Sequence, residues 1–325
     1  MKAIVLVGGE GTRLRPLTFT TPKQMLPVGG LPMIERVLAG LARHGIDEVV
    51  LSLGYRPDAF LEAYPDGRCA GVRLHYAVEP EPLDTAGAIA FAARHARLQD
   101  TFVVANGDVL TDLDVSALIR FHREHDAEAT IALTPVEDPS RFGVVPTDDE
   151  GRVLAFIEKP PGEAPTNLIN AGTYVLEPSV VDRIPTGRKV SIEREIFPAV
   201  AAAARLFALA SDADWVDAGT PSTYLAANLR YVVAPPESCE VSAGATVESS
   251  VLGEGVRVGD GAKVIDSVLF DDVVIGPGAN VRSSIVGRGA EVEEGADVAD
   301  LTVLGDGEIV AAGRVLRGAK LPEGE

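Results

Sequence analysis

Residues Glu248–Val258 read ESSVLGEGVRV, and three similar blocks follow at intervals of 17 residues. The other blocks are IDSVLFDDVVI, RSSIVGRGAEV and ADLTVLGDGEI, at Ile265–Ile275, Arg282–Val292 and Ala299–Ile309. The four blocks align without gaps, and aliphatic residues within each recur about every six residues, as in hexapeptide repeats. Three six-residue faces with one shortened corner predict a parallel β-helix from about Val241 to Lys320, in which each coil buries aliphatic side chains against the next.

The first part of the chain alternates between strand and helix patterns. Lys2–Val7 (KAIVLV) is an uninterrupted apolar run, as expected for a strand buried on both faces of a parallel sheet. Further strands are predicted at Val49–Leu53, Val72–Ala77 and Phe102–Ala105, and helices at Leu31–His44, Thr85–His95 and Asp114–His125. This order predicts a doubly wound α/β sheet that binds its ligands at the carboxyl ends of the strands.

Beyond residue 129 the pattern becomes mixed, with strands predicted at Ala129–Thr134, Val153–Glu158 and Thr173–Leu176. A last helix, Pro221–Val232, leads into the stiff linker Ala234-Pro235-Pro236. We therefore expect two domains, an α/β domain at residues 1–233 and a β-helix at residues 239–321.

Composition narrows the class of protein. The chain has 325 residues, of which 46% are hydrophobic, and no apolar run approaches the roughly 18 residues of a membrane span. Its net charge of −19 argues against general affinity for nucleic acids or anionic membranes, although a few well-placed cations still allow a nucleotide ligand. Cys69 and Cys239 lie in different predicted domains, which favours free thiols in a reducing compartment. We expect a cytoplasmic protein.

A glycine-rich segment follows the first strand directly, and residues 8–18 read GGEGTRLRPLT. Glycines let the backbone turn tightly and direct N–H groups at an anion. A dinucleotide-binding fingerprint would need glycine at Leu14, and a Walker loop would need Gly-Lys-Ser/Thr after a four-residue gap. Ten residues beyond Arg13, Lys23 lies within PKQMLP, where the flanking prolines fix the backbone and direct the ammonium toward the same loop.

Together these two segments resemble the signature of the sugar-1-phosphate nucleotidylyltransferases, G-G-x-G-T-R-L-x-P-L-T followed by P-K-x-x-x-P. The resemblance covers the whole chain, is closest to mannose-1-phosphate guanylyltransferases, and implies a Rossmann-like mixed sheet followed by a left-handed β-helix of hexapeptide repeats. It also implies transfer of a nucleotidyl group from a nucleoside triphosphate to a sugar 1-phosphate with release of pyrophosphate, here from GTP to mannose 1-phosphate to give GDP-mannose.

The resemblance assigns the phosphate and metal ligands. Arg13 would stabilise the departing pyrophosphate, Lys23 would offset charge at the α-phosphate, and Asp108 and Asp217 would hold Mg²⁺. Taken alone, each aspartate would be expected to have only a structural role, as a turn residue or a helix cap. The flanking ANGD and WVDAGTP sequences favour the metal assignment. Two carboxylates suffice because Mg²⁺ is usually completed by substrate phosphates and water. The nucleotide phosphates would also contact Gly8, Gly9, Gly11 and Thr12.

By the same resemblance, Lys159 would bind the sugar phosphate and Glu158 a sugar hydroxyl. Asn170 and the Gly172 backbone would bind other sugar groups, and Glu193 either reaches the sugar or only belongs to an amphipathic helix. The remaining substrate contacts implied are Asn106, Gly107 and Gly143.

Base choice depends on the segment at residues 79–87, EPEPLDTAG. Glu79 stands where uridylyl- and thymidylyltransferases tend to have glutamine, and a carboxylate can accept both adjacent donors of guanine. Thr85, Ala86 and Gly87 also resemble guanylyltransferases. Asp84 departs from the usual glycine and must either adopt a left-handed conformation or alter the pocket. Gln24, in place of a proline, resembles thymidylyltransferases. A thymidylyl- or uridylyltransferase acting on glucose 1-phosphate is therefore the alternative.

Two rival classes follow from the repeat. Hexapeptide β-helices often carry acyltransferases that rely on a histidine, but none of the five histidines lies beyond His125, so we expect a structural or oligomerising module. A non-catalytic regulatory or assembly subunit is the second rival, and the intact loop and metal positions argue against it. We expect a homo-oligomer assembled through the β-helix.

Overall fold

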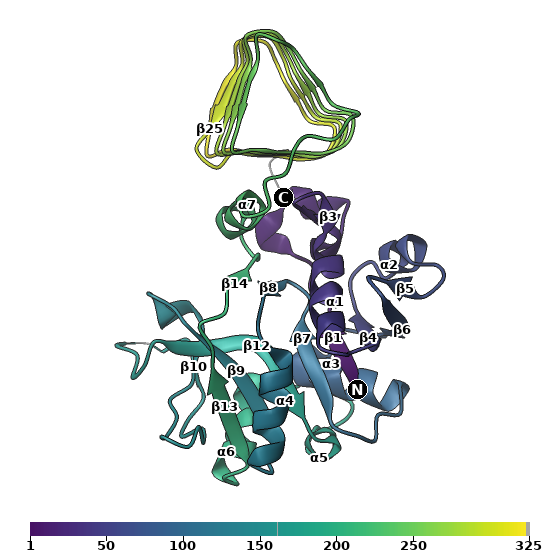
Figure 1. The fold of residues 1–325 in the computed structure, drawn as a ribbon, viewed down its shortest axis with the longest axis vertical. Helices are drawn as coiled ribbons and strands as arrows, with labels where there is room; N and C mark the ends of the chain where they lie inside the picture. The colour runs from purple at the N-terminus through teal and green to yellow at the C-terminus, as the bar shows by residue number, and fades with distance from the viewer. Residues whose placement is uncertain (161, 323–325) are drawn as a thin grey trace. The chain divides into compact units, whose positions relative to one another are not determined.

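The computed structural model describes residues 1–160 and 162–322 and divides them into two compact units (Figure 1). The first unit contains Met1–Gly9 and Ile34–Trp215. The second contains Glu10–Met33 and the chain from Val216 onward. The β-helix thus shares a compact unit with the glycine-rich segment, although the two lie at opposite ends of the sequence.

The first unit is built on a mixed ten-stranded sheet in which β11, β10, β12, β7, β1, β4, β6 and β5 follow one another, with β9 beside β12 and β13 beside β9. Its central strands, β7, β1, β4 and β6, are mutually parallel, as the apolar runs predict. Strand β12 runs antiparallel to β7 and makes the sheet mixed. The strand bounds are β1 (Lys2–Leu6), β4 (Glu48–Leu53), β5 (Arg68–Cys69), β6 (Val72–Val78), β7 (Phe102–Asn106), β9 (Ala129–Pro135), β10 (Gly143–Val144), β11 (Ile157–Glu158), β12 (Leu168–Leu176) and β13 (Leu206–Ala210).

The helices of this unit pack on the sheet and close its hydrophobic core. Helix α3 contacts β1 and β4 through buried small residues, because alanine side chains allow a helix to approach a sheet closely. Tyr174, Phe102 and Phe197 are the largest fully buried side chains of this core. The helices are α1 (Met33–Arg43), α2 (Asp58–Ala63), α3 (Asp84–His95), α4 (Val115–Glu124), α5 (Pro178–Asp182) and α6 (Phe197–Ala202), with a π-helical turn at Ile192–Ile196.

Two predictions about these elements need correction. The strand predicted at Val153–Glu158 is wrong over most of its length, since only Ile157–Glu158 pairs as a strand and Leu154 is 63% exposed. The helix predicted from Leu31 begins at Met33, because Leu31–Pro32 (β3) pairs with Pro27–Val28 (β2) in a short hairpin.

The second unit contains the left-handed β-helix, made of three parallel sheets of five short strands that enclose a triangular interior (Figure 1). Its first sheet holds β15 (Glu240–Val241), β18 (Arg257–Val258), β21 (Val274–Ile275), β24 (Glu291–Val292) and β27 (Ile309–Val310). Its second sheet holds β16 (Thr246–Glu248), β19 (Lys263–Ile265), β22 (Asn280–Arg282), β25 (Asp297–Ala299) and β28 (Val315–Arg317). Its third sheet holds β17 (Val251–Leu252), β20 (Val268–Leu269), β23 (Ile285–Val286), β26 (Val303–Leu304) and β29 (Lys320–Leu321).

Aliphatic side chains fill the interior, as the repeat predicts. A column of buried hydroxyls runs along one corner of the coils. Ser267 Oγ donates to the carbonyl oxygen of Ile265 at 2.7 Å and accepts from the Ser284 amide at 3.2 Å, and Ser250 has the matching role one coil earlier. Each hydroxyl therefore links adjacent coils where a corner would otherwise leave buried backbone groups unsatisfied.

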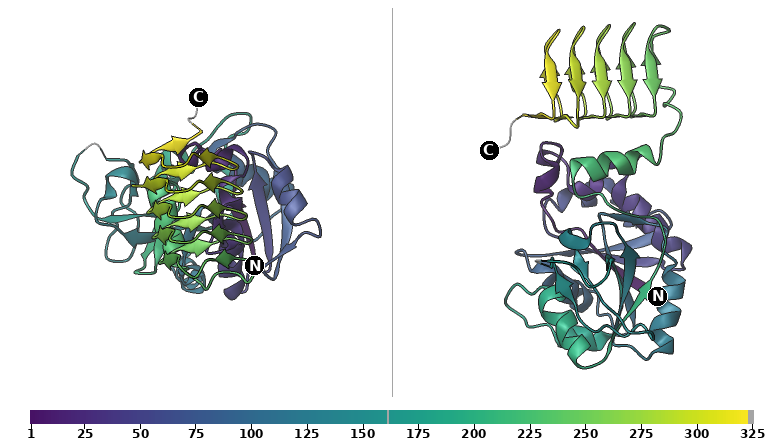
Figure 2. Two further views of the ribbon diagram at one scale, coloured as in Figure 1. Left: turned by 90° about the horizontal axis from the view of Figure 1, so that it is seen from above. Right: turned by 90° about the vertical axis from the view of Figure 1, so that its left-hand side faces the viewer.

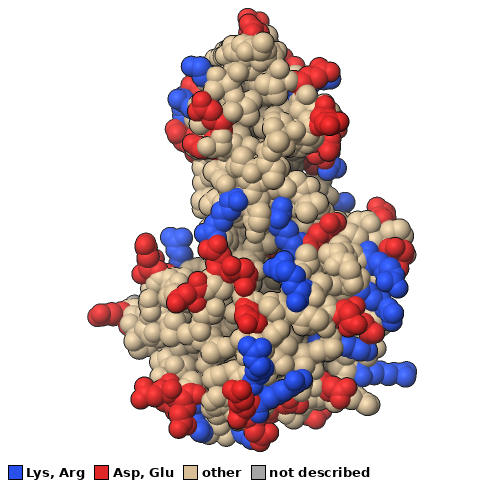
Figure 3. Space-filling view, viewed as in Figure 1, with Lys and Arg blue, Asp and Glu red and all other residues tan. Residues whose placement is uncertain are grey.

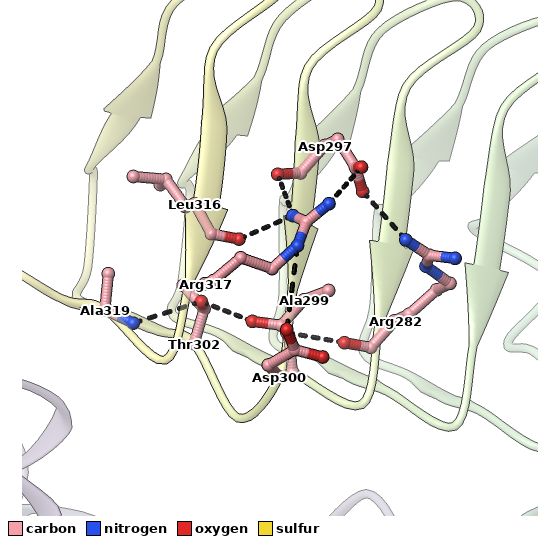
Figure 4. Close-up of polar contacts among 9 residues, drawn as sticks. Arg282, Asp297, Ala299, Asp300, Thr302, Leu316, Arg317 and Ala319 are labelled. Carbon is pink, nitrogen blue, oxygen red and sulfur yellow. Dashed lines mark hydrogen bonds and ion pairs between the residues drawn. The ribbon is translucent and has the colours of Figure 1, made fainter.

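The ungapped alignment of the fourth block is wrong beyond Asp300, because that coil has one more residue than the others. Ile285 pairs with Val303 and Val292 with Val310, whereas an uninterrupted 17-residue period would pair them with Thr302 and Ile309. The extra residue lies at the corner, where Asp300 and Leu301 both adopt positive φ. Thr302 keeps the hydroxyl column intact by donating to the Ala299 carbonyl, three residues back (Figure 4).

Helix α7 (Pro221–Leu229) and the segment 10–33 complete the second unit (Figure 2). The segment contains three single turns of 3₁₀-helix, at Thr12–Leu14, Leu17–Phe19 and Lys23–Met25. Thr220 caps α7 in a reciprocal capping box with Thr223. The two remaining strands are β8 (Val109–Thr111) and β14 (Trp215–Asp217).

Surface features agree with the composition. On the face shown in Figure 3, Lys and Arg side chains are interspersed with Asp and Glu. Within residues 1–160 and 162–322, every helix is too short or too polar to cross a bilayer. Both cysteines are free thiols, Cys69 buried and Cys239 partly exposed.

Candidate nucleotide-binding and sugar-phosphate-binding site

Glycines bring strand ends together at the carboxyl edge of the sheet. A Cβ atom on Gly54 would lie 2.9 Å from the Gly8 carbonyl oxygen, and one on Gly107 would lie 2.6 Å from Val7 Cγ1. Because real side chains do not fit at such distances, glycine is required for the ends of β1, β4 and β7 to approach. The predicted phosphate-binding residues Gly8 and Gly9 therefore lie beside the segment that carries Asn106 and Asp108.

The same edge continues across β12. Gly172 adopts φ +75°, and a Cβ atom there would lie 2.6 Å from Asn106 Nδ2. Asn170 Oδ1 accepts a hydrogen bond from the Gly172 amide at 2.9 Å, and its Nδ2 donates to the Tyr174 hydroxyl at 2.8 Å. The pairing of β12 with β9 is irregular between Asn170 and Tyr174, so the bulge aims this residue set at the edge.

Tyr174 is fully buried beneath three of the predicted site carboxylates. Burial raises the pKa of its phenol far above the ordinary value, and the negative charges of Glu193, Glu158 and Asp108 raise it further. These three carboxylates, contributed by separate parts of the first unit, therefore gather around one neutral hydroxyl.

Glu79 is held firmly at the end of β6. Its Oε1 accepts from Ser52 Oγ at 3.0 Å and its Oε2 from the Leu83 amide at 3.2 Å. Burial raises the pKa of the Glu79 carboxyl, and these two hydrogen bonds oppose that effect. Since a carboxylate oxygen has two lone pairs, each oxygen keeps capacity for one more donor. A Cβ atom on Gly8 would lie 3.5 Å from Glu79 Oε1, so the carboxylate borders the glycine loop.

The structure shows that Asp84 adopts the left-handed conformation, one of the two outcomes expected where the family usually has glycine. It adopts φ +62°, the left-handed conformation for which glycine is the usual residue, and its Oδ1 accepts from the Thr85 amide at 2.8 Å. Aspartate tolerates this conformation better than most residues because its short side chain bonds to nearby backbone.

Thr85 connects the base segment to Glu193. Its hydroxyl donates to Glu193 Oε2 at 2.7 Å and accepts from the Ile192 amide at 2.9 Å. Ser191 Oγ also donates to Glu193 Oε2, at 2.7 Å. Two hydroxyls therefore orient the Glu193 carboxylate, which packing of an amphipathic helix alone would not require. The neighbouring amides of Ala86 and Gly87 both donate to the Val190 carbonyl, which further ties the two segments together.

The predicted sugar-phosphate residues lie on the short hairpin β10–β11. Gly143 pairs with Glu158, and a Cβ atom on Gly143 would lie 2.7 Å from Phe156 Cε1. Lys159 is exposed, adopts φ +48°, and places its Nζ 3.7 Å from Glu158 Oε1. The Lys159 ammonium is therefore accessible to an anionic ligand that arrives from solvent.

In the second unit, the two signature segments converge on Gly219. A Cβ atom on Gly219 would lie 2.7 Å from Asp217 Oδ1, 2.8 Å from Arg13 Nη2 and 3.2 Å from Lys23 Nζ. Lys23 is only 5% exposed, and its Nζ lies 3.8 Å from Asp217 Oδ1. The structure thus brings together three residues that the sequence analysis assigned to phosphate and metal binding.

The turn that presents Arg13 is stabilised locally. Gly11 adopts φ +65°, and its carbonyl accepts from the Thr18 hydroxyl at 2.9 Å. A Cβ atom on Gly11 would meet Thr18 Cγ2 at 3.0 Å and Lys23 Cβ at 3.1 Å. Thr12 is exposed and begins the 3₁₀ turn that follows. A glycine is required here both for conformation and for space.

The two predicted metal ligands belong to different units, Asp108 to the first and Asp217 to the second. No group of three or more His, Cys, Asp or Glu side chains within the described chain could by itself hold a metal ion. The assignment of both aspartates to Mg²⁺ therefore stays a prediction. The chemistry of each carboxylate suits this ion, which commonly takes one or two carboxylates and completes its shell with substrate phosphates and water.

Several site residues were missed by the sequence analysis. Gly219 had a usable signal, since it stands two residues after a predicted metal ligand in a glycine-containing turn. Tyr174 follows Asn170 by four residues, but only the bulge in β12 brings them into contact. Ser52 carries no local signal, because its role depends on Glu79, 27 residues away. Ser191 had a usable signal, since it precedes Glu193 by two residues and caps the same helical turn.

Comparison with protein families covers nearly the whole chain. The family described as nucleotidyl transferase matches residues 2–232, and the family described as GMPPB C-terminal domain matches residues 231–322. Mannose-1-phosphate guanylyltransferase from Mycobacterium tuberculosis is 43% identical over 289 residues, which cover 83% of this chain and 80% of the relative. The mannose-1-phosphate guanyltransferase of Yarrowia lipolytica is 40% identical over 267 residues, or 81% of this chain and 73% of the relative.

Solved structures show the same fold. HddC from Yersinia pseudotuberculosis, complexed with GMP-PN, superposes with a TM-score of 0.60 at 28% identity, over 71% of this chain and 99% of the other. A Bacillus anthracis protein described as a candidate glucose-1-phosphate thymidylyltransferase, in complex with sucrose, gives a TM-score of 0.65 at 27% identity, over 71% of this chain and 95% of the other. The expected Rossmann-like mixed sheet followed by a β-helix is confirmed, and the chain belongs to the nucleotidyl transferase family, within the group of the mannose-1-phosphate guanylyltransferases.

Proposed function

We propose that this protein transfers the guanylyl group of GTP to mannose 1-phosphate, forming GDP-mannose and releasing pyrophosphate. The observation that carries the proposal is the convergence of Arg13, Lys23 and Asp217 on Gly219, which gathers two cations and a carboxylate from separate segments. The identity of the substrates is supported by the relatives, which are named as mannose-1-phosphate guanylyltransferases and match this chain over most of their length.

The chemistry needs no nucleophilic side chain. A phosphate oxygen of the sugar 1-phosphate, already an anion at neutral pH, attacks the α-phosphorus, and the bond from that phosphorus to the pyrophosphate oxygen breaks. The protein then contributes positioning and charge neutralisation. Arg13 and the amides of the glycine loop stabilise the departing pyrophosphate, Lys23 offsets charge at the α-phosphate, and Lys159 reduces the repulsion between the two anionic substrates.

We propose that Asp108 and Asp217 hold a Mg²⁺ ion. When bound, this ion supplies positive charge that neutralises phosphate oxygens of both substrates. The carboxylate oxygens of the two aspartates suit a hard cation, and neither residue needs a further protein ligand beside it.

Base selection rests on Glu79. Guanine presents two adjacent donors, its N1–H and its exocyclic amine, to which a carboxylate is complementary. The proposal is supported by the fixed orientation of the Glu79 carboxylate, which Ser52 and the Leu83 amide hold by one oxygen each. The sugar is bound by Asn170, the Gly172 backbone and Glu158, with Glu193 oriented toward the same region through Thr85.

The test is pyrophosphate release in the presence of Mg²⁺ from GTP, dTTP, UTP and ATP, each combined with mannose 1-phosphate or glucose 1-phosphate. We expect GTP with mannose 1-phosphate to dominate and chelation of the metal to abolish the signal. Dominance of dTTP or UTP would keep the reaction class and contradict the role of Glu79. Silence with every pair would contradict the catalytic proposal and favour a regulatory subunit.

Assembly through the β-helix remains a prediction. Sedimentation of the full chain would test it, with a homo-oligomer as the expected result and a monomer at micromolar concentration as the contrary one.

A further inference from the structure

The first four strands of the third sheet of the β-helix are covered on both faces. Leu252, Leu269, Val286 and Leu304 point into the interior of the coils. The residues that precede them along the strands point the opposite way, since successive side chains of a strand alternate. These outward-pointing residues are nevertheless buried, and they are Val251, Val268, Ile285 and Val303.

Helix α7 covers the early coils of this sheet. It contacts β20, and the Tyr224 ring lies edge-on to Phe270 with 6.5 Å between centroids. The same helix binds the end of the segment 10–33. Asn228 Oδ1 accepts from the Gly29 amide at 3.0 Å, and the Tyr224 hydroxyl donates to the Pro27 carbonyl.

The last coils contact the beginning of the segment instead. Lys320 Nζ donates to the Arg13 carbonyl oxygen at 3.0 Å. The Thr20 hydroxyl donates to Asp306 Oδ2 at 2.6 Å. Figure 2 shows the segment, in purple, beside the yellow last coils, whereas α7 lies beside the green first coils.

Close packing accompanies these two polar contacts. A Cβ atom on Gly305 would lie 3.2 Å from Pro16 Cβ, so the chain between Arg13 and Thr20 lies directly against the coil. Asp306 is itself anchored, because its Oδ1 accepts from the Arg288 amide at 2.9 Å. The coil therefore presents a fixed acceptor to Thr20, held by the preceding turn of the β-helix.

We propose that Lys320 and Asp306, in the last coils of the β-helix, are positioning residues for Arg13. Lys320 holds the main chain of Arg13 itself, and Asp306 holds the turn that follows. The β-helix thereby fixes where the guanidinium stands relative to Lys23 and Asp217. This role rests on the proposed function, in which Arg13 stabilises the departing pyrophosphate.

The experiment uses five variants of the full chain, one of which is Arg13→Ala alone, the reference for the double variant. Lys320→Met removes the ammonium and keeps the length of the side chain, and Thr20→Val removes the hydroxyl and keeps its shape. Lys263→Met is the matched control, since Lys263 is an exposed lysine on β19 of the same β-helix. Arg13→Ala combined with Lys320→Met tests whether the lysine acts through Arg13.

We expect Lys320→Met and Thr20→Val each to lower kcat/KM for pyrophosphate release about three- to ten-fold, the range that one hydrogen bond of ordinary net strength gives. The loss should lie mainly in kcat, Lys263→Met should be silent, and Lys320→Met should add nothing in the Arg13→Ala background. An undiminished effect of Lys320→Met in that background would overturn the proposal, as would an equal loss in Lys263→Met.

A second measurement separates this proposal from the proposed function. Hydrogen exchange of the peptide spanning residues 10–22, without substrate, should accelerate in Lys320→Met and Thr20→Val and stay unchanged in Lys263→Met. Unchanged exchange in all three would contradict the positioning role even if the wild-type enzyme is active. Accelerated exchange in Lys320→Met and Thr20→Val, together with a wild-type chain that releases no pyrophosphate, would keep the contact and refute only the catalytic assignment.

Discussion

Lys23 Nζ lies 3.8 Å from Asp217 Oδ1. This ion pair joins the PKQMLP segment to the WVDAGTP segment, which are almost two hundred residues apart in sequence. The lysine is only 5% exposed. A charge that deep is costly unless other charges compensate it, so the arrangement suits a site that receives an anionic substrate beside a carboxylate.

Substitution of Lys23 should therefore disable the enzyme. In Lys23→Ala we expect kcat to fall about 10²–10³-fold, the range observed for removal of a preorganised charge contact. Lys23→Arg should also be impaired, because a planar guanidinium does not reproduce a compact ammonium. Steady-state pyrophosphate release measures both, with Lys263→Ala as the exposed control. Near-wild-type turnover in a folded Lys23→Ala protein would remove this lysine from the mechanism.

Gly219→Ala should reduce activity without unfolding the protein. The new methyl group would lie 2.7 Å from Asp217 Oδ1 and 2.8 Å from Arg13 Nη2, both ends of flexible side chains that can move aside. Because a displacement of about 1 Å at a reacting centre can cost up to about 100-fold, we expect at least a ten-fold loss in kcat. Gly40→Ala, inside α1 with only Arg43 Nη2 nearby at 3.8 Å, is the control and should retain full activity. Equal activity in both variants would show that Gly219 does not restrain the cluster.

Base recognition by Glu79 should depend on pH. Burial raises the pKa of this carboxyl above its ordinary value of 4.5, so protonation begins at a higher pH than in an exposed glutamate. The carboxylate accepts both guanine donors, whereas the protonated form does not. The KM for GTP should therefore rise as pH falls toward the raised pKa, and Glu79→Gln should remove this rise while shifting preference toward pyrimidine nucleotides. Kinetics between pH 5 and 8 with GTP and UTP measure both effects, and an unaltered pH profile in Glu79→Gln would contradict the assignment.

Asp84 offers a test of backbone strain. Glycine adopts its φ of +62° freely, whereas alanine is strained there by about 1–2 kcal/mol and also lacks the bond to the Thr85 amide. We expect Asp84→Gly to melt at or above the wild-type temperature and Asp84→Ala to melt about 2–4 °C lower. Differential scanning calorimetry distinguishes the two. Equal melting of both variants would mean that conformation at this residue contributes nothing to stability.

Much of the fold could be predicted from local patterns. The apolar run at Lys2–Val7 identified the central strand, and the six-residue spacing identified the β-helix, because both patterns are dictated by burial within a few neighbouring residues. The positive φ of Asp84 was one of two outcomes that its sequence position allowed.

The extra residue at Leu301 could not be found from the pattern. Its neighbours Val303 and Leu304 are both aliphatic, so either register places an aliphatic side chain inside the coil, and only the strand pairing decides between them. The strand predicted at Val153–Glu158 failed for a related reason, since the apolar run VLAFI suits a strand locally but only Ile157–Glu158 found a partner strand.

The candidate site was only partly accessible to sequence reasoning. Motif flanks identified Arg13, Lys23 and Asp217, and the structure brings them together within one unit. The motif identified Thr85, but its hydrogen bond to Glu193, 108 residues away, could not be predicted, and neither could that of Ser52 to Glu79 on the neighbouring strand end. The same is true of Asp306 and Lys320, whose partners are about three hundred residues away.

The hydrogen bond between Lys320 and Arg13 spans 307 residues, so the turn that carries Arg13 gains this support only after the last coils of the β-helix have been synthesised. At about 5–20 residues per second of synthesis, the glycine-rich segment waits about 15–60 seconds before the coil that holds it exists. During that interval the Arg13 carbonyl and the Thr20 hydroxyl lack the partners that Lys320 and Asp306 supply in the finished protein. A nascent chain that stalls before these coils would leave the turn that carries Arg13 without both hydrogen bonds, so synthesis of the later repeat becomes a condition for ordering the earlier loop.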